Sequence, residues 1–381
     1  MYQQVKLDEV CVRKIETISS DENGLIDYFD IASVDNTKKK IISHQSLKVK
    51  EAPSRAKQIV QLNDILVSTV RPNLNAIAMI DNKTKNKMVA STGFCVLRAS
   101  EKIEPRYLFY FVQSPTFINS MTAQATGASY PAVSNSIVKS SHIPLPDLPT
   151  QRRIADTLDK VSEGIELCRR MLGELDLMVK AKFVEMFGEP IANTHSLPLI
   201  PLSEIGNWSS GGTPSRSTPA YFEGNIDWYS AGELNTLYLE GSIEKITQDA
   251  LENSAAKLFS AGSMLVGMYD TAALKMGILK RSSASNQACA CIEPNDNIDI
   301  VWLYHVLQIM KPHFLEQRRG IRQKNLNLGM IKSFQVPYAP KSEQKLFASF
   351  VTKIDKSKLT IQGIRDKMET EKLALMQGYF G

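Results

Sequence analysis

The segment 318–325 concentrates four cations and two side-chain amides. It consists of Arg318, Arg319, Gly320, Ile321, Arg322, Gln323, Lys324 and Asn325. Guanidinium and ammonium groups bind phosphates, and guanidinium and amide groups can also hydrogen-bond to the edges of nucleic-acid bases. A basic run of this kind also suits the solvated end of a helix. The segment is therefore a candidate contact with an anionic polymer, and a solvated helix end remains the alternative.

The first half of the chain has an uncharged polar loop at the corresponding place. Gly127 lies 193 residues before Gly320, and hydroxyl side chains surround it. The candidate contacts in this loop are Thr126, Gly127, Ser129 and Tyr130. Glycine also serves ordinary turns, so a purely structural role for the loop remains the alternative.

A further group of polar residues follows a predicted strand at 65–70. Arg71 could pair with guanine through two hydrogen bonds, and Asn73 or Asn75 could pair with adenine. One good pair of this kind gives about 1–3 kcal/mol of discrimination between bases. Tyr269 stands at the equivalent place in the second half. Asparagine and proline are also common in plain turns.

A glycine-rich loop offers another possible phosphate contact. Gly212, Thr213, Ser215 and Arg216 supply backbone amides, hydroxyls and a guanidinium group, but the same residues also suit an ordinary loop. The lysine run at 38–40 is interpreted as a solvated charge run rather than a specific contact.

Composition excludes several classes of protein. The chain has 381 residues, and 45 basic against 40 acidic side chains give a net charge of +5, which permits a nucleic-acid partner without requiring one. No apolar run approaches the roughly 18 residues of a membrane span. Five cysteines without a C-x-x-C pair and five scattered histidines indicate no metal site and no catalytic histidine. We expect a cytoplasmic protein without contact to a membrane.

Part of the sequence occurs twice at an offset of 193 residues. The stretch at 139–144 returns at 332–337, and each copy ends in Phe-Gly, at 187–188 and at 380–381. This duplication predicts an internal repeat with pseudo-two-fold symmetry. The predicted order is a variable domain, a repeated segment, a second variable domain and a second repeated segment. The predicted boundaries are 1–143, 144–190, 191–336 and 337–381.

Each variable segment reads as an α+β domain. Short β-branched runs such as 65–70 alternate with Asn, Gly and Pro clusters, and 105–120 and 300–317 look helical. Four aromatic residues, Tyr28, Phe29, Trp228 and Tyr229, are interpreted as core residues. Cys289 and Cys291 lie on a probable strand, and we expect at most one of them to face inward.

The repeated segments predict long helices that pair through an apolar seam. After an extended proline-rich lead-in, apolar residues recur at alternating spacings of four and three. The first helix is predicted to begin around Pro149 and to end near Gly188; Ser342 is predicted to cap the second. The first seam consists of Ile154, Leu158, Val161, Ile165, Cys168, Leu172, Leu175 and Val179. The second contains Phe347, Ile354, Ile361, Met368 and Leu375.

Three cations interrupt the second seam. Lys358, Arg365 and Lys372 occupy positions where the pattern expects apolar residues. Either this part of the helix faces solvent, or the stems of the side chains pack while the charges reach outward. The expected arrangement is one antiparallel pair with an imperfect seam.

The sequence resembles the specificity subunit of type I restriction-modification systems over essentially its whole length. The resemblance rests on IPLPDLPTQRRIADTL (143–158), VPYAPKSEQKLFASFV (336–351) and SSGGTPSRSTPAYFEGNIDWYSAGEL (209–234). It implies two globular α/β target recognition domains, separated by two long antiparallel coiled-coil helices. Each domain would read one half of a split double-stranded DNA site.

The resemblance also implies partners and the absence of catalysis. The helices would bind two methyltransferase subunits, which hold S-adenosylmethionine, and restriction translocase subunits would join them. This chain itself would bind no cofactor. Consistent with this, the sequence has no N-P-P-aromatic tetrapeptide and no G-x-x-x-x-G-K-[ST] loop. The alternative is an adaptor protein whose helices bind proteins and whose domains bind peptides or carbohydrate.

Overall fold

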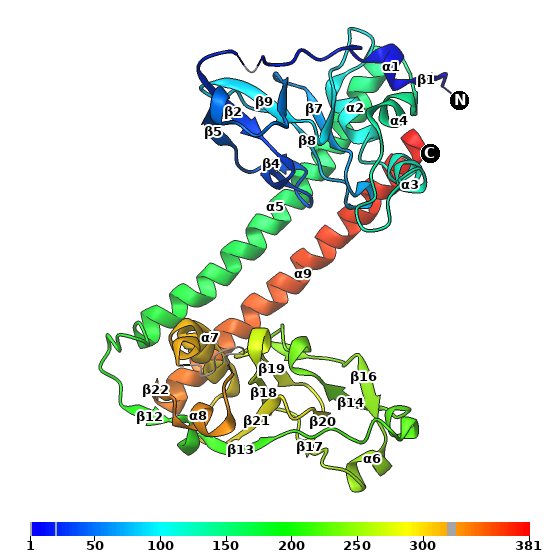
Figure 1. Cartoon of the computed structure of the whole chain (residues 1–381). Coiled ribbons are helices and arrows are strands. Elements are labelled where there is room, and N and C mark those ends of the chain that lie inside the picture. The colour runs from blue at the N-terminus through cyan, green and yellow to red at the C-terminus, as the bar shows by residue number, and fades with distance from the viewer. Residues whose placement is uncertain (1, 20, 318–324) are drawn as a thin grey trace. The chain divides into compact units, whose positions relative to one another are not determined.

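The computed structural model describes residues 2–19, 21–317 and 325–381. Two compact units divide the chain. Unit 1 combines residues 1–169 with 362–381, and unit 2 comprises residues 170–361. The N-terminal strand β1 and the C-terminal end of helix α9 therefore belong to the same unit (Figure 1).

The described residues of unit 1 form two main sheets and two short strand pairs. The four-stranded sheet has the order β5 (Gln45–Lys48), β2 (Leu25–Phe29), β9 (Lys87–Ser91) and β6 (Ala56–Ile59). The three-stranded sheet has the order β10 (Phe94–Leu97), β7 (Ile65–Ser68) and β8 (Ile77–Met79). The short pairs join β1 (Gln4–Lys6) to β11 (His142–Pro144) and β3 (Val34–Asp35) to β4 (Lys40–Ile41).

Unit 2 repeats this topology, with one additional strand at each edge of its second sheet. Its four-stranded sheet has the order β16 (Glu244–Ile246), β14 (Ile226–Tyr229), β20 (Ser283–Ser285) and β17 (Leu258–Phe259). Its five-stranded sheet has the order β13 (Gly206–Ser210), β21 (Cys289–Pro294), β18 (Met264–Gly267), β19 (Met276–Leu279) and β15 (Tyr238–Leu239). The short pair joins β12 (Leu199–Pro201) to β22 (Gln335–Pro337).

The correspondence extends to strand direction. In unit 1 the central pair β2 and β9 is parallel, and in unit 2 the corresponding pair β14 and β20 is also parallel. In both units the outer neighbours of these pairs are antiparallel. The duplication in the sequence thus continues through the two segments that look unlike in sequence, and the predicted internal repeat is confirmed.

Helices cover these sheets. Those of unit 1 are α1 (Leu7–Val10), α2 (Pro105–Phe111), α3 (Pro115–Ala123) and α4 (Asn135–Ser140), and those of unit 2 include α6 (Gln248–Glu252), α7 (Ile300–Glu316) and α8 (Leu328–Ser333). The prediction of a helix at 300–317 is confirmed to within one residue. The one predicted at 105–120 is divided in two, because the Ser114 hydroxyl accepts a hydrogen bond from the Phe117 amide and Pro115 begins a new helix.

Two helices of 40 residues, α5 (Leu148–Phe187) and α9 (Lys341–Phe380), correspond to the predicted pair. The second begins at Lys341, so Ser342 lies inside its first turn and the prediction that Ser342 caps it is wrong. In unit 1 the start of α5 packs with the end of α9, where Ile154 and Leu158 share a core with Met376 and Phe380. In unit 2 the end of α5 packs with the start of α9. This pairing is antiparallel, as predicted.

The predicted seam positions are buried or half-buried. On α5, Leu158 and Ile165 are buried, and Val161, Leu172 and Leu175 are half-buried. On α9, Ile354 is buried, and Ile361 and Met368 are half-buried. The alternating spacing of four and three therefore identified the packed face of both helices.

The three seam cations are half-buried, and each one contacts a neighbouring side chain. Lys358 Nζ lies 2.6 Å from Asp176 Oδ1 on α5. Arg365 bonds to the adjacent Asp366 at 2.7 Å. Lys372 Nζ lies 5.4 Å from the centre of the Tyr110 ring, within the range of a cation–π contact. These contacts favour the second alternative, in which the side-chain stems pack in the seam and the charges reach its edge.

The core predictions are confirmed for the aromatic residues and wrong for the cysteines. Tyr28, Phe29, Trp228 and Tyr229 are all buried. Cys289 and Cys291 are both buried in one cluster. Residues two apart on a strand point to the same face, and β21 is an inner strand, so both thiols face inward.

A buried histidine joins α7 to α9 in unit 2. The His305 ring packs against the Phe347 ring at 5.3 Å, and burial, followed by the nearby Lys358, lowers the pKa of His305 from 6.5 to about 4. Between pH 6.5 and pH 4, His305 is protonated in the unfolded chain but stays neutral in the folded chain, so the free energy of unfolding decreases as the pH falls. We expect unit 2 to lose about 1 kcal/mol between pH 7 and pH 5.5. Urea unfolding of wild type and His305→Phe at both pH values measures this loss, which the variant should lack.

Among the described residues, the structure contains no helix that is both long enough and apolar enough to cross a membrane.

Candidate nucleic-acid interface

In unit 1 the structure joins two of the predicted loops. The β7–β8 loop comprises residues 69–76, and the α3–α4 loop comprises residues 124–134. The Val133 amide donates to the Thr69 carbonyl at 2.9 Å, and the Arg71 amide donates to the Pro131 carbonyl at 2.7 Å. Segments that lie about 60 residues apart in sequence therefore form one surface.

Arg71 and Tyr130 are the exposed side chains at the centre of this surface. The Arg71 guanidinium carbon lies 4.9 Å from the centre of the Tyr130 ring, and 69% of Tyr130 is exposed. An aromatic face holds a guanidinium group in place without using its hydrogen-bond donors. Among the residues that the structure describes, none accepts a hydrogen bond from the Arg71 guanidinium group in addition to this ring contact, so its donors can meet an acceptor on a ligand.

The shape of the α3–α4 loop depends on Gly127. Its φ is +105°, and a Cβ there would lie 2.9 Å from the Tyr130 carbonyl oxygen. Only glycine fits such a position without strain. Thr126 and Ser129 flank it and are exposed, so the turn presents their hydroxyls to solvent.

The two predicted asparagine readers differ. Asn73 is exposed, as a reader must be. Asn75 is only 7% exposed, and its side-chain amide donates to the Val112 carbonyl at 3.1 Å. Both Arg71 and Asn75 have left-handed backbone, with φ of 50° and 48°. Asn75 thus holds the end of the loop to the C-terminal end of α2, while the exposed Asn73 side chain can face a ligand.

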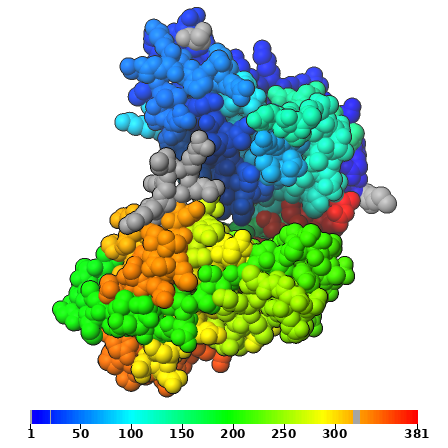
Figure 2. All heavy atoms as spheres, turned by 60° about the horizontal axis from the view of Figure 1, so that its bottom comes forward, coloured from blue at the N-terminus to red at the C-terminus, as the bar shows by residue number. Residues whose placement is uncertain are grey.

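Unit 2 joins the corresponding segments. The β18–β19 loop comprises residues 268–275, and the α7–α8 loop comprises residues 317–327. The Leu326 amide donates to the Met268 carbonyl at 2.8 Å, and the Asp270 amide donates to the Asn325 side-chain oxygen at 2.9 Å. Yellow and orange atoms, the colours of the part of the chain from β18 to α8, adjoin in Figure 2. Tyr269 is 41% exposed on this surface.

The remaining predicted contacts of this loop lie outside the described residues. They are Arg319, Gly320, Arg322, Gln323 and Lys324. Asn325, the neighbouring residue that the structure does describe, holds the β18–β19 loop through the hydrogen bond to Asp270.

The glycine-rich loop of unit 2 is occupied by contacts within its own domain. Gly212 is buried, and a Cβ there would lie 1.9 Å from the Ala255 carbonyl oxygen. Arg216 bonds to both carboxylate oxygens of Glu244 and stacks 4.2 Å from the centre of the Phe222 ring. Thr213 donates to Gln287, and Ser215 hydrogen-bonds to Ser217. These contacts favour the ordinary-loop alternative over a phosphate clamp.

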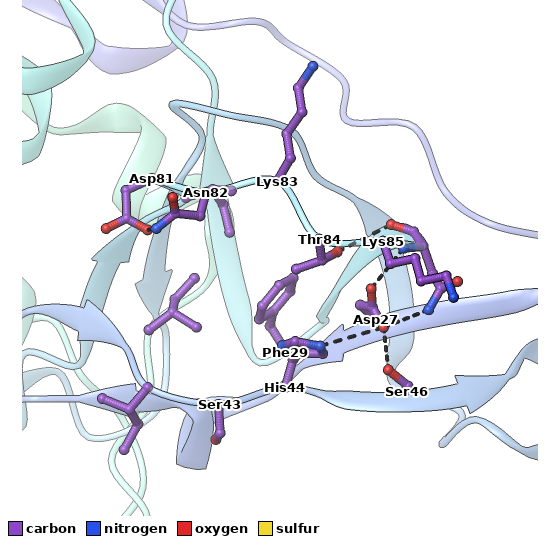
Figure 3. Close-up of a pocket in the computed structure, with 14 residues that line it drawn as sticks. Asp27, Phe29, Ser43, His44, Ser46, Asp81, Asn82, Lys83, Thr84 and Lys85 are labelled. Atoms are coloured by element: carbon purple, nitrogen blue, oxygen red, sulfur yellow. Dashed lines mark hydrogen bonds and ion pairs between the residues drawn. The ribbon is translucent and has the colours of Figure 1, made fainter.

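A buried aspartate that sequence reasoning missed stands at the same place in both units. The Asp27 carboxylate accepts hydrogen bonds from Ser46 at 2.5 Å and from the Asn86 backbone and side chain at 2.9 and 3.0 Å (Figure 3). Burial opposes its charge, but these hydrogen bonds outweigh it and hold the pKa of Asp27 well below its usual range. In unit 2, Asp227 likewise accepts from a serine, Ser242 at 3.2 Å, and it also binds Arg281 at 2.5 Å.

The repeated Ile-Asp-aromatic-aromatic tetrapeptide at 26–29 and 226–229 was the available signal for this pair. In unit 1 the aspartate borders an open cavity of about 490 Å³, which His44 and Lys85 also line (Figure 3). This cavity does not include the predicted contact residues. The buried carboxylates anchor the loops beside β2 and β14 rather than forming part of the candidate interface.

The fold itself has solved counterparts. A chain from a structure on complex assembly and conformational transition of the type I restriction-modification system aligns over 100% of this chain and 97% of its own length, with 24% identity and a TM-score of 0.63. The S subunit of a type I restriction-modification system from M. genitalium aligns over 100% and 96%, with 15% identity and a TM-score of 0.61. At these identities the likeness concerns the fold alone.

The chain belongs to the family of the type I restriction modification DNA specificity domain, whose sequence profile matches residues 1–176 and again residues 199–370. Similar proteins include a type I restriction enzyme specificity subunit of Escherichia coli, 25% identical over 236 residues. Another, from Haemophilus influenzae, is 30% identical over 142 residues. These alignments cover 58% and 36% of this chain, and 57% and 31% of the relatives.

Proposed function

We propose that this chain is the non-catalytic DNA-specificity subunit of a type I restriction-modification complex. Each unit reads one half of a split, asymmetric site in double-stranded DNA. The paired helices scaffold two methyltransferase subunits, which bind S-adenosylmethionine, and restriction translocase subunits join this core.

The observation that carries the proposal is the repeated junction of two loops. In each unit, a loop between two neighbouring antiparallel strands is hydrogen-bonded to a loop that follows a helix. The bonded residues are Thr69 and Val133 in unit 1 and Met268 and Leu326 in unit 2. Loops on a rigid scaffold are where recognition residues are usually found. The membership in the DNA-specificity family supports DNA as what these junctions bind.

The two junctions differ in chemistry, and this supports a split site whose halves differ. Unit 1 presents Arg71 stacked on Tyr130, whereas unit 2 presents Tyr269 beside Asp270. An arginine can contact a guanine with two donors, and a tyrosine hydroxyl or ring makes different contacts. One framework with different exposed side chains can therefore read two different sequences.

The proposal is tested by mapping adenine methylation in a host that expresses this chain with a type I methyltransferase subunit. We expect one motif of two unlike halves, separated by a fixed gap of about 5–8 base pairs at 3.4 Å per step. A continuous or palindromic motif, or no motif, contradicts the proposal.

The variant Arg71→Ala extends this experiment to one half-site. Loss of the Arg71 guanidinium group should relax the sequence requirement at one position of one half-site, by about 1–3 kcal/mol of discrimination between bases. The other half-site should stay unchanged. Arg55→Ala, which removes an exposed arginine of unit 1 from outside both loops, is the matched control and should leave both halves intact. If the motif of Arg71→Ala equals that of wild type, Arg71 reads no base.

A further inference from the structure

The cavity of about 490 Å³ in unit 1 is bordered by a buried carboxylate (Figure 3). Asp27, on β2, is only 1% exposed. Burial opposes its charge, but hydrogen bonds from Ser46, Asn86 and Thr84 hold the pKa of Asp27 well below its usual range. The wall of the cavity therefore has a negative charge at neutral pH.

The groups that hydrogen-bond to this carboxylate are neutral. Ser46 donates its hydroxyl at 2.5 Å, and Asn86 donates its side-chain amide at 3.0 Å and its backbone amide at 2.9 Å. The His44 ring nitrogen Nε2 lies 3.7 Å from Asp27 Oδ1 and carries a positive charge only when it is protonated. Among the described residues, no lysine or arginine forms an ion pair with Asp27.

Asn86 stands at the position where unit 2 has an arginine. Strand β9 pairs in parallel with β2, and β20 pairs in parallel with β14. The equivalent residues of β9 and β20 are Val89 and Ala284, because they pair with the third residue of each Ile-Asp-aromatic-aromatic tetrapeptide. Asn86 and Arg281 each lie three residues before them, so they occupy the same position in the two units.

The two buried aspartates differ in how their charge is compensated. Arg281 Nε lies 2.5 Å from the Asp227 carboxylate, so unit 2 pairs its buried charge within the chain. Asn86 offers Asp27 uncharged amides in place of this guanidinium group. A buried charge is stabilised most when an opposite charge and hydrogen bonds act together. Unit 1 thus has the carboxylate of this ion pair without the cation.

The remaining walls of the cavity suit an arginine side chain. The rings of Phe29 and His44 lie with their centres 5.8 Å apart, and Ile41 and Ile80 add apolar surface. An arginine packs its apolar stem on such surface and stacks its planar guanidinium group on aromatic rings. The ammonium group of lysine is compact and more strongly hydrated. The lining therefore fits an arginine better than a lysine.

The charged residues at the rim leave the carboxylate unpaired. Lys83 and Lys85 border the cavity, but both are exposed, and within the described part of the chain neither forms an ion pair with Asp27. The Lys83 side chain points away from Asp27 (Figure 3). Asp81, at the same rim, is also exposed. The rim thus presents solvated charges of both signs around one buried negative charge.

We propose that this cavity is a docking site for an arginine side chain of a partner protein, which brings to Asp27 the cation that Arg281 brings to Asp227. The cavity does not include the candidate DNA contacts, so the inference does not depend on the proposed function. A carboxylate accepts a guanidinium group through charge-assisted hydrogen bonds, which are stronger than those between neutral groups. Unit 1 would take its arginine from a second polypeptide, whereas unit 2 has its own.

The first arm of the test measures binding of the peptide acetyl-Gly-Arg-Gly-amide to the full-length chain by ligand-observed NMR. The matched probe carries citrulline in place of arginine, which keeps the shape of the side chain and removes its charge. We expect a Kd on the order of 1 mM for the arginine peptide, as befits a single side chain. The citrulline peptide should bind about tenfold more weakly or worse, because it cannot form an ion pair.

The second arm uses variants to locate this binding. Asp27→Asn removes the charge at nearly constant size and should weaken binding about tenfold or more. Asn86→Arg copies unit 2: it should abolish binding and raise the melting temperature by about 2–4 °C, since the cavity is then filled from within the chain. Because Asn86→Arg keeps the carboxylate, it decides the question even if Asp27→Asn does not fold. The matched control is Asn119→Arg, at an exposed position of α3 outside the cavity, which should change neither quantity.

Free L-arginine distinguishes two sources of the guanidinium group. Binding of the peptide at least as tight as that of free arginine supports a partner protein. Tenfold tighter binding of free arginine would assign the cavity to a small molecule and overturn the docking proposal. The proposal also fails if the arginine peptide does not bind, if the two peptides bind alike, or if Asn86→Arg behaves like its control. None of these results bears on DNA reading, which the methylation motif tests separately.

Discussion

Replacing Phe380 by Ala is expected to destabilise unit 1 by about 3–5 kcal/mol, the usual cost of removing a buried aromatic side chain. Phe380 is 3% exposed and ends α9 within the core of unit 1. Its ring lies 5.2 Å from the ring of Tyr107 and 5.8 Å from that of Phe111. The cavity left by the substitution would border both rings, and α2 would no longer pack on the helix end.

Hydrogen exchange resolved by peptide, followed through a urea titration, measures this effect in unit 1 separately from unit 2. Gln377→Ala removes an exposed side chain from the same helix turn and should change stability by less than about 0.5 kcal/mol. The corresponding residue of unit 2, Phe187, is 2% exposed and packs on Phe347 and Trp302, so Phe187→Ala should destabilise unit 2 instead. Equal losses in both units from either single variant would contradict this division.

Removing the Asp64 carboxylate is expected to cost about 3–5 kcal/mol, because it leaves a largely buried guanidinium group without its partner. Asp64 is fully buried, and its two oxygens accept from Arg98 Nε at 2.8 Å and Nη2 at 2.7 Å. The same carboxylate also accepts from the Gln61 amide at 2.9 Å. It therefore holds the start of β7 to the end of β10.

Urea unfolding of Asp64→Ala measures this cost, and Glu22→Ala is its control. Glu22 binds Lys87 at 2.6 Å, but both side chains are substantially exposed and screened by water, so the loss of this pair should cost far less than the loss of the Asp64 carboxylate. The double variant Asp64→Ala with Arg98→Met should recover part of the loss, since it leaves no unpaired charge behind. A double variant that is less stable than Asp64→Ala alone would mean that the Arg98 stem, rather than its charge, matters most.

The features that the sequence predicted well are those set by periodicity. The alternating spacing from Ile154 to Val179 follows from the geometry of paired helices, so it identified both the helix and its buried face. The repeat at an offset of 193 likewise predicted two similar units. Buried aromatic residues such as Trp228 were predictable because large apolar side chains gain most from burial.

The features that sequence reasoning could not resolve depend on interactions between distant segments. Asn73 and Asn75 have the same side chain two positions apart, and only the carbonyl of Val112 distinguishes the buried residue from the exposed one. Arg216 looked available for a phosphate until Glu244, 28 residues away, proved to bind it. Lys39 belongs to the run at 38–40 that was predicted to be solvated, yet it is half-buried and its ammonium group donates to the carbonyl of Asn75, 36 residues away.

Unit 1 is formed by both ends of the chain, and this determines which unit is completed last during protein synthesis. Its core joins Val5 and Leu7, made before any of unit 2, to Met376 and Phe380, made after all of unit 2. Unit 2 is one continuous segment, so its core needs no residue that is made after Ile361. The earlier of the two domains to leave the ribosome is thus the later to be completed, and its apolar surface waits for about 200 further residues.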